Sequence, residues 1–306
     1  MKIDLQDSST LTWLILGAIV VVALTYSTIA LRSEPPVRSY TLVEGYQFPY
    51  DLYNPEWKVD LPSELKEISG IAALPDEQVL AIQDEAGILF SIDLRQGNVH
   101  EEHLFGKDRD YEDLCLVGDT VFVLERDGDL YRLPPGEFST DSVYKYETSF
   151  SYRNDTESLC YDPVTGYLLM SPKESAPDGS EEVEHVRGIY GFSIDSARVM
   201  PQPLYSMAEQ EVGQAISGNG KPYNFKPSAI GVHPQTGHIY VLASVGKLLL
   251  VLDRDNRLLH IELMDASVFP QAEGISFDEK GRLLIASEGV DRPAFVARFA
   301  TQPDVK

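Results

Sequence analysis

A short motif recurs along this chain at nearly constant spacing, and this repeat restricts the fold more than any other feature. Its copies are ISGIAAL, YEDLCLV, TESLCYD, PSAIGVH and AEGISFD, and their second residues are Ser69, Glu112, Glu157, Ser228 and Glu273. Successive copies are 43, 45, 71 and 45 residues apart. A period of roughly 40–50 residues is typical of the blades of a β-propeller.

Each copy of the motif begins a unit of several short apolar runs separated by turn residues. The motif is followed by a second run, such as VFVLER from Val121, and by a third, such as ILFSID or KLLLVLD. Most units have a fourth, more polar run, such as VHEEHLF from Val99. Four antiparallel strands make one blade, so the sequence predicts an all-β propeller of five blades. The step of 71 residues leaves a sixth, degenerate blade possible, but the unit near Glu157 already supplies four strands, so five are preferred.

The two ends of the repeat predict how the ring closes. The fifth unit ends near Phe299 with three strands, whereas WKVDLP from Trp57 is a strand without a blade of its own. We expect this N-terminal strand to complete the last blade, because closure removes the exposed strand edges of an open array.

The N-terminal region predicts a membrane anchor. Residues 11–31 form a run of 21 residues without a charge, and roughly 20 apolar residues cross a bilayer as a helix. The predicted divisions are a leader (1–10), a transmembrane helix (11–31), a linker (32–53) and the propeller (54–306). A cleaved signal peptide is the alternative, although the run exceeds the roughly 7–15 apolar residues of such peptides. A short leader before a large domain is the usual plan of a bacterial signal anchor, so we expect an inner-membrane protein with its propeller in the periplasm.

The charge balance limits the partners of the domain. The chain has 25 Lys and Arg against 48 Asp and Glu, a net charge of −23. This charge argues against nucleic acid and anionic lipid surfaces. Cations and basic partners remain.

The two cysteines are expected to be free thiols. Cys115 and Cys160 occupy matching places in two units. Matching places on neighbouring blades are separated by about 10 Å, which is beyond the reach of a disulfide.

The repeat also predicts where chemistry is concentrated. In a blade the first strand lies along the central channel and the second returns beside it, so the start of one and the end of the other share a face. The pairs predicted on that face are Ser69 with Asp84, Glu112 with Glu125, Glu157 with Lys173, Ser228 with Ser244, and Glu273 with Glu288.

Three glutamates of this set predict a cation site at the channel mouth. We expect Glu112, Glu157 and Glu273 to converge there as metal ligands, with calcium preferred because it takes about 6–8 oxygen ligands. Alternatively, Lys173 and Arg126 neutralise the ring from within.

Two classes of function follow from this prediction. The preferred one is an envelope module that binds a small-molecule or protein ligand at the channel face, because no nucleophile-and-base set is recognisable. The alternative is a calcium-dependent hydrolase of a phosphoester or lactone, with Lys173 or Glu125 as the acid–base residue.

The motifs together resemble the SdiA-regulated propeller proteins of bacteria. The resemblance rests on KEISGIA, DYEDLCLV, VFVLERDGDLY, DTESLCYD, KPSAIGVHP and AEGISFD, and it covers about residues 54–300. It implies the propeller and the envelope location but no reaction. More distantly, the acidic positions look like those of gluconolactonase-like and esterase-like phytase propellers, whose channel-mouth carboxylates hold calcium. Ser69 and Ser228 depart from the Asn and Asp ligands of those lactonases, which weighs against hydrolase activity.

Overall fold

The computed structural model of the chain describes residues 16, 18, 19, 38–135 and 142–302. The chain divides into two compact units, Met1–Arg38 and Ser39–Lys306. The predicted membrane segment, residues 11–31, lies almost entirely outside the described residues. Among the residues that the structure describes, no helix is long and apolar enough to cross a membrane.

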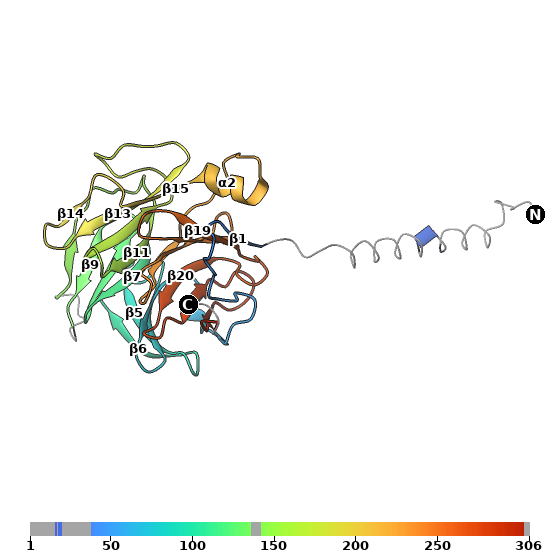
Figure 1. Cartoon of the computed structure of the whole chain (residues 1–306). Coiled ribbons are helices and arrows are strands. Elements are labelled where there is room, and N and C mark those ends of the chain that lie inside the picture. Colours follow the sequence, from blue (N-terminus) through green and yellow to red (C-terminus); the bar gives the residue numbers. More distant parts are fainter. Residues whose placement is uncertain (1–15, 17, 20–37, 136–141, 303–306) are drawn as a thin grey trace, which may run out of the picture. The chain divides into compact units, whose positions relative to one another are not determined.

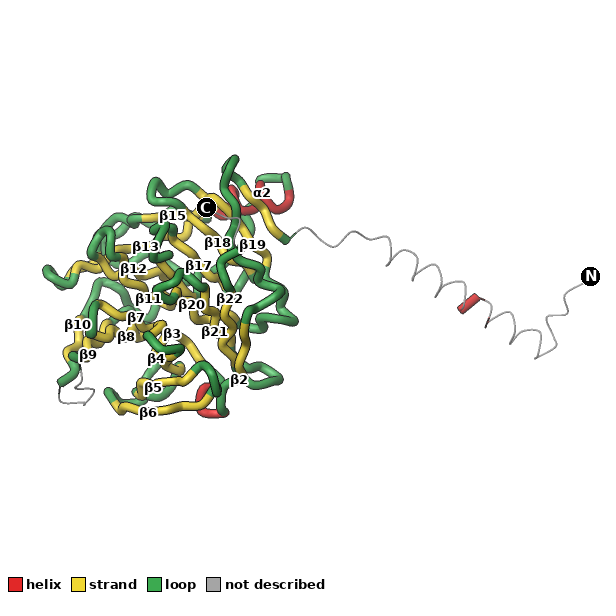
Figure 2. The backbone as a smooth tube through the Cα atoms, turned by 60° about the horizontal axis from the view of Figure 1, so that its bottom comes forward, coloured by secondary structure: helices red, strands yellow, loops and turns green. Residues whose placement is uncertain are grey.

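The second unit is a propeller of five antiparallel sheets, which confirms the predicted blade number (Figure 1). The strands of blades 1 and 2 are β3 (Ile68–Leu74), β4 (Gln78–Gln83), β5 (Ile88–Asp93), β6 (Asn98–Leu104), β7 (Tyr111–Val117), β8 (Thr120–Glu125), β9 (Leu130–Leu133) and β10 (Tyr144–Tyr146). Those of blade 3 are β11 (Thr156–Asp162), β12 (Tyr167–Pro172), β13 (Val186–Ser193) and β14 (Arg198–Val199), with β15 (Tyr205–Ala208) also paired to β13. Figure 2 shows the inner strands β3, β7 and β11 near the middle of the domain and β6 and β10 at its rim.

Blades 4 and 5 each take a strand from the N-terminal part of the unit. The strands of blade 4 are β16 (Ala229–Val232), β17 (Ile239–Ala243), β18 (Leu248–Leu252), β19 (Leu258–Leu263) and β1 (Ser39–Thr41). Those of blade 5 are β20 (Ala272–Phe277), β21 (Leu283–Ser287), β22 (Phe295–Phe299) and β2 (Trp57–Asp60). Strand β2 pairs with β22 in the register Trp57↔Arg298 to Asp60↔Phe295. The predicted ring closure by the N-terminal strand is therefore confirmed.

The core consists of five apolar clusters, and each lies between two neighbouring blades. In β8, Val121 and Val123 pack toward blade 1, whereas Phe122 and Leu124 pack toward blade 3. Both faces of such a strand are buried, so the sequence shows a continuous apolar run instead of an alternating one. This is why the second and third runs of each repeat are short and almost wholly apolar.

The compact unit begins earlier than the predicted boundary at residue 54. Strand β1 pairs with β19, so it adds a fifth strand to blade 4. Tyr50 and Leu52 are buried in the cluster between blades 4 and 5, and Phe48 packs against it. The segment from residue 39 to residue 53 is therefore part of the domain, because its aromatic side chains bury apolar surface that a linker would leave in water.

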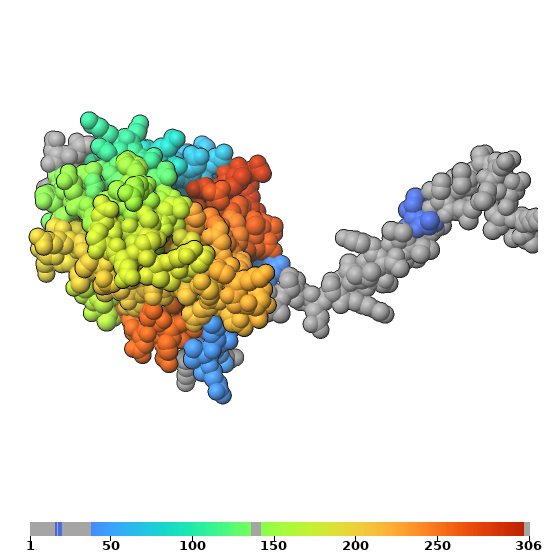
Figure 3. Space-filling view, turned by 90° about the horizontal axis from the view of Figure 1, so that it is seen from above, coloured from blue at the N-terminus to red at the C-terminus, as the bar shows by residue number. Residues whose placement is uncertain are grey.

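The 71-residue step holds no sixth sheet in the described part of the chain. It contains β14, β15 and a short helix, α2 (Glu209–Ser217), which the sequence analysis did not predict. The helix ends at Gly218, whose φ of 67° places it in the left-handed conformation common after a helix C-terminus. The space-filling view in Figure 3 shows a face formed largely by this middle part of the chain, coloured yellow-green to amber.

The structure confirms the two free thiols, although only one of the two cysteines is buried. Cys115 and Cys160 are both free, Cys115 is buried, and Cys160 is partly exposed. Burial raises the pKa of both thiols above the ordinary value, so neither has the thiolate character of a reactive cysteine.

Candidate functional site: an acidic cavity at the channel mouth

The second residue of the motif lies in a β-bulge in four of the five blades. The inner strand and its neighbour slip in register at this residue in each case. The four bulge residues are Ser69, Glu112, Glu157 and Glu273. A bulge inserts one unpaired residue and re-aims its side chain, and bulges are enriched beside functional sites. Here all four side chains line a single cavity.

This cavity, the channel-mouth cavity, has a volume of about 340 Å³. All of its lining residues are polar or charged: Ser69, Asp84, Asp110, Glu112, Arg126, Asp155, Glu157, Lys173, Gln271, Glu273 and Glu288. They come from three equivalent positions of blades 1, 2, 3 and 5. These are the residue before the inner strand, the bulge residue, and the residue that directly follows the second strand. The repeat therefore builds the cavity as well as the fold.

One predicted residue, Glu125, points elsewhere. It pairs with Tyr111 in the ladder, and its fully buried carboxylate accepts hydrogen bonds from Tyr131 Oη (2.6 Å) and Arg109 Nη1 (2.9 Å). Arg126 occupies the equivalent position instead, since its N–H donates to Asp110 O (2.9 Å) as that of Lys173 donates to Asp155 O (2.7 Å). The prediction was one residue out in this blade because the β7–β8 hairpin is shorter than the others.

Blade 4 does not contribute to the cavity. Ser228 Oγ donates to Ala272 O (2.8 Å), a link from the inner part of blade 4 to blade 5. The Ser244 N–H donates to Ser228 Oγ (3.2 Å). Neither serine lines the cavity, but both side chains hydrogen-bond to the lining residue Glu273. The other predicted residues, Ser69, Asp84, Lys173 and Glu288, line it together with the three glutamates.

Sequence reasoning missed three lining residues that precede the inner strands. They are Asp110, Asp155 and Gln271, each two positions before a bulge glutamate. Their signal was present in the repeat, because DYEDL and DTESL place an aspartate at the same distance from the glutamate.

Two cationic side chains partly neutralise the cavity. Lys173 Nζ lies 2.6 Å from Glu157 Oε2, and Arg126 Nε lies 2.5 Å from Asp155 Oδ1. The lining nevertheless contains seven acidic residues against these two basic ones. Self-neutralisation, the alternative considered from the sequence, is therefore incomplete.

Comparison with known proteins agrees with the fold and the motifs. The model of the SdiA-regulated family matches residues 51–295. The chain belongs to the SdiA-regulated family. A search of curated protein sequences finds no match.

Solved structures similar to this SdiA-regulated protein share its fold at low sequence identity. Glutaminyl cyclase from Myxococcus xanthus is 13% identical with a TM-score of 0.56, over 88% of this chain and 99% of that one. A PQQ-bound aldose sugar dehydrogenase from Streptomyces coelicolor is 9% identical with a TM-score of 0.50, over 88% and 100%. A gluconolactonase from Xanthomonas campestris is 15% identical with a TM-score of 0.45, over 76% and 72%. At these identities the likeness shows the fold alone.

The carboxyl groups of this SdiA-regulated protein's channel-mouth cavity are buried close together, and this raises the pKa of several of them. Burial, with repulsion from Glu157, raises the pKa of Glu112 to about 9. Burial raises the pKa of Glu157 to about 7, although Lys173 opposes the rise. Burial and the charge of Glu273 raise the pKa of Glu288 to about 8. At neutral pH, Glu112 and Glu288 therefore hold protons that a bound cation would displace.

The side of the cavity formed by blades 5 and 1 has no cationic side chain. Glu288 accepts a hydrogen bond from Gln271 Nε2 (2.8 Å). Asp84 Oδ1 is buried without a hydrogen-bond partner among the described residues. Burial and the charge of Glu67 raise the pKa of Asp84 to about 6. A cation entering the cavity would find its least compensated carboxyl groups here.

Metal-ligand geometry is not preformed in this SdiA-regulated protein. Within residues 38–135 and 142–302, no group of three or more acidic, histidine or cysteine side chains is arranged to hold a metal ion. The three predicted ligands share a cavity but would have to move to share an ion. The calcium site stays a prediction.

The two predicted acid–base residues are poorly suited to that role. Although burial opposes it, the charges of Glu157 and Glu273 raise the pKa of the Lys173 amine, so this amine is protonated at neutral pH. Glu125 is held below its ordinary pKa against the effect of burial by hydrogen bonds from Tyr131 and Arg109. Neither is a base with a free lone pair facing the cavity.

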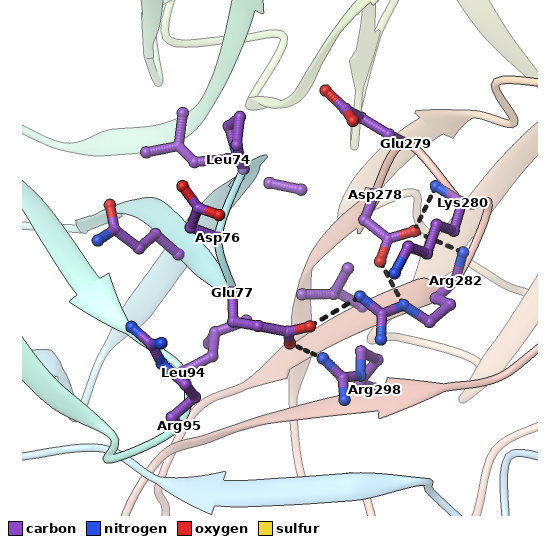
Figure 4. Close-up of a pocket in the computed structure, with 14 residues that line it drawn as sticks. Leu74, Asp76, Glu77, Leu94, Arg95, Asp278, Glu279, Lys280, Arg282 and Arg298 are labelled. Carbon is purple, nitrogen blue, oxygen red and sulfur yellow. Dashed lines mark hydrogen bonds and ion pairs between the residues drawn. The ribbon is translucent and has the colours of Figure 1, made fainter.

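A second charged cavity lies at the opposite ends of the inner strands of blades 1 and 5, with a volume of about 390 Å³. Figure 4 shows Glu77 between two guanidinium groups, Arg282 (3.0 Å) and Arg298. Asp76 and Glu77 lie in the three-residue turn between β3 and β4 and have positive φ values of 59° and 62°. The lining of this opposite-end cavity is balanced in charge, with four acidic and four basic residues, and Arg282 and Arg298 form ion pairs within it.

Proposed function

We propose that this protein is an envelope ligand-binding propeller whose channel-mouth cavity takes a positively charged ligand. The observation that carries the proposal is the imbalance of seven acidic against two basic lining residues. It is reinforced by bulges that direct Glu112, Glu157 and Glu273 into one space. A ligand cation would replace the protons that these carboxyl groups retain, and so would remove part of the cost of burying them together.

Calcium and organic amines are the two sources of charge that the cavity favours. Calcium suits carboxylate and water oxygens but would require the glutamates to rearrange. An amine needs fewer ligands and fits the wholly polar lining of a cavity of about 340 Å³. The shared chemistry is a cation held by the carboxyl groups that the bulges direct into the cavity.

Thermal melting of the full chain in a non-ionic detergent, after chelator treatment, tests this proposal. Calcium or a small diamine should raise the melting temperature, and Glu112→Gln should reduce that rise. Glu102→Gln, an exposed glutamate on β6, is the matched control and should behave as the parent.

The outcomes separate the sources. Stabilisation by calcium alone assigns a metal site, and stabilisation by the diamine alone assigns an amine site. Calorimetry without binding of either, with unchanged melting, would contradict the proposal and leave Lys173 and Arg126 as the counter-ions of the cavity.

The location of the protein is part of the same proposal. An anchor at residues 11–31 would place the propeller in the periplasm of a bacterial inner-membrane protein. Fractionation should recover the full chain in membranes, and removal of residues 1–31 should release it. A soluble form shortened at its N-terminus by cleavage near Ala30 would contradict the anchor.

A further inference from the structure

A third cavity lies at the outer edge of blade 4, where residues 39–53 pack against the sheet. Its volume is about 410 Å³. Its lining residues are Ser39, Thr41, Tyr46, Gln47, Phe48, Tyr50, Asp51, Leu52, Tyr53, His260, Glu262 and Gln302. It shares no residue with the channel-mouth cavity. We name it the outer-edge cavity.

A buried carboxylate that no described lysine or arginine contacts lines the outer-edge cavity. Glu262 is only 6% exposed, and its Oε2 lies 3.1 Å from Nε2 of the fully buried His260. On the other side of the ring, His260 Nδ1 lies 3.1 Å from Thr41 Oγ1. Ser39 Oγ also lies 3.4 Å from Nε2 of the same ring. Among residues 38–135 and 142–302, no lysine or arginine pairs with Glu262.

Aromatic rings form the rest of the wall. Phe48 stacks on His260 with a centroid distance of 4.5 Å and an interplanar angle of 6°. Tyr46 and Tyr50 line the cavity beside it, and Tyr53 is 37% exposed. The lining includes no lysine or arginine. The outer-edge cavity therefore combines aromatic side chains with a buried acidic residue, Glu262, and a partly exposed one, Asp51.

We propose that the outer-edge cavity binds a small organic ammonium ion, such as a quaternary amine. The negative faces of aromatic rings attract cations, and aromatic cages are a recurrent way to recognise quaternary ammonium groups. The apolar methyl groups would contact the rings, while the charge would compensate Glu262. This site is independent of the one at the channel mouth, which has no aromatic lining residue.

Calorimetry on the full chain in a non-ionic detergent tests the proposal with choline and its uncharged isostere, in which a tert-butyl group replaces the trimethylammonium group. Choline should bind at least roughly tenfold more tightly than the isostere. Glu262→Gln keeps the shape of the side chain and should weaken choline binding by about tenfold. Tyr53→Leu keeps apolar volume without a ring and should weaken it several-fold, whereas Tyr144→Leu, an exposed tyrosine of blade 2, should not.

Three results would overturn this inference. They are the absence of choline binding, equal affinity for choline and its isostere, and a folded Glu262→Gln variant with parental affinity for choline. If Glu262→Gln does not fold, Tyr53→Leu decides, because unchanged choline affinity in that variant excludes recognition by the rings.

Discussion

The channel-mouth cavity and the opposite-end cavity differ in how their charges are paired. Their volumes are similar, about 340 and 390 Å³, and charged residues dominate both. At the opposite end four acidic residues meet four basic ones, whereas at the channel mouth seven acidic residues meet two. The same repeat thus produces one end of the propeller at which ion pairs join blades 1 and 5, and one end at which acidic residues outnumber basic ones. Unpaired buried charge costs stability, so its presence at one end points to a ligand.

The largest effect is expected from breaking the paired end. The Arg298 side chain is 13% exposed and contacts both Glu77 and Glu56 (3.0 Å). Arg298→Met would leave Glu56 and Glu77 with Arg282 as their remaining cationic partner. We expect a loss of about 2 kcal/mol in the free energy of unfolding, because both carboxylates are partly exposed. Denaturant titration measures it, with Arg132→Met, an exposed arginine on β9, as the control. Equal stability of Arg298→Met and the parent would show that this network does not hold blades 1 and 5 together.

The unpaired end should make the parent protein less stable as pH rises. The folded-state pKa values of Glu112, Glu157 and Glu288 are raised to about 9, 7 and 8, above those of the unfolded chain. Their contribution is fully present below the unfolded values and is lost as pH rises through the folded ones, because the folded state retains more protons. We expect a loss on the order of 2 kcal/mol between about pH 5 and about pH 9. Melting curves across this range check it, and a rise in stability would contradict it.

The repeat made most of the fold and part of the channel-mouth cavity predictable. Equivalent positions recur in each unit, so the sequence predicts that Glu112, Glu157 and Glu273 share one cavity, as they do in the structure. The number of residues between the two strands of a hairpin is not constant, however. The turn between β7 and β8 is short, and Arg126 lines the cavity where the sequence predicts Glu125. Ser228 does not itself line the cavity, because its hydroxyl contacts Ala272 O and Glu273 of the neighbouring blade.

The N-terminal part of the domain was beyond sequence reasoning for a different reason. Residues 39–53 have no strand or helix period, and their place depends on contacts with distant residues. Phe48 stacks on His260, and the Tyr50 hydroxyl donates to Gly281 O (2.6 Å), more than two hundred residues away. Such contacts leave no local pattern, so the outer-edge cavity that they form could not be predicted.

A smaller effect, opposite in sign to that of Arg298→Met, is expected when one glutamate of the unpaired end is neutralised. Glu112→Gln removes a carboxyl group that must keep its proton, so the variant should gain on the order of 1–2 kcal/mol at about pH 8.5. At about pH 5 the Glu112 carboxyl of the folded parent is protonated and therefore uncharged, like the glutamine of the variant, so the gain should be small. Glu77→Gln at the paired end is the matched control and should lose stability. A loss in both variants would remove the distinction between the two ends.

The smallest effect is expected from an exposed ion pair at the opposite-end cavity, which tests whether pairing matters there without burial. Arg95 Nη2 lies 2.9 Å from Asp93 Oδ2, and its side chain is 62% exposed. The hydrogen bond from Arg95 lowers the pKa of Asp93, but water and salt screen a pair this open. Arg95→Gln should therefore leave the melting temperature unchanged within the error of the measurement, at low and at high salt. A clear loss at low salt would mean that long-range charge balance, and not the buried contacts of Glu77, stabilises the paired end.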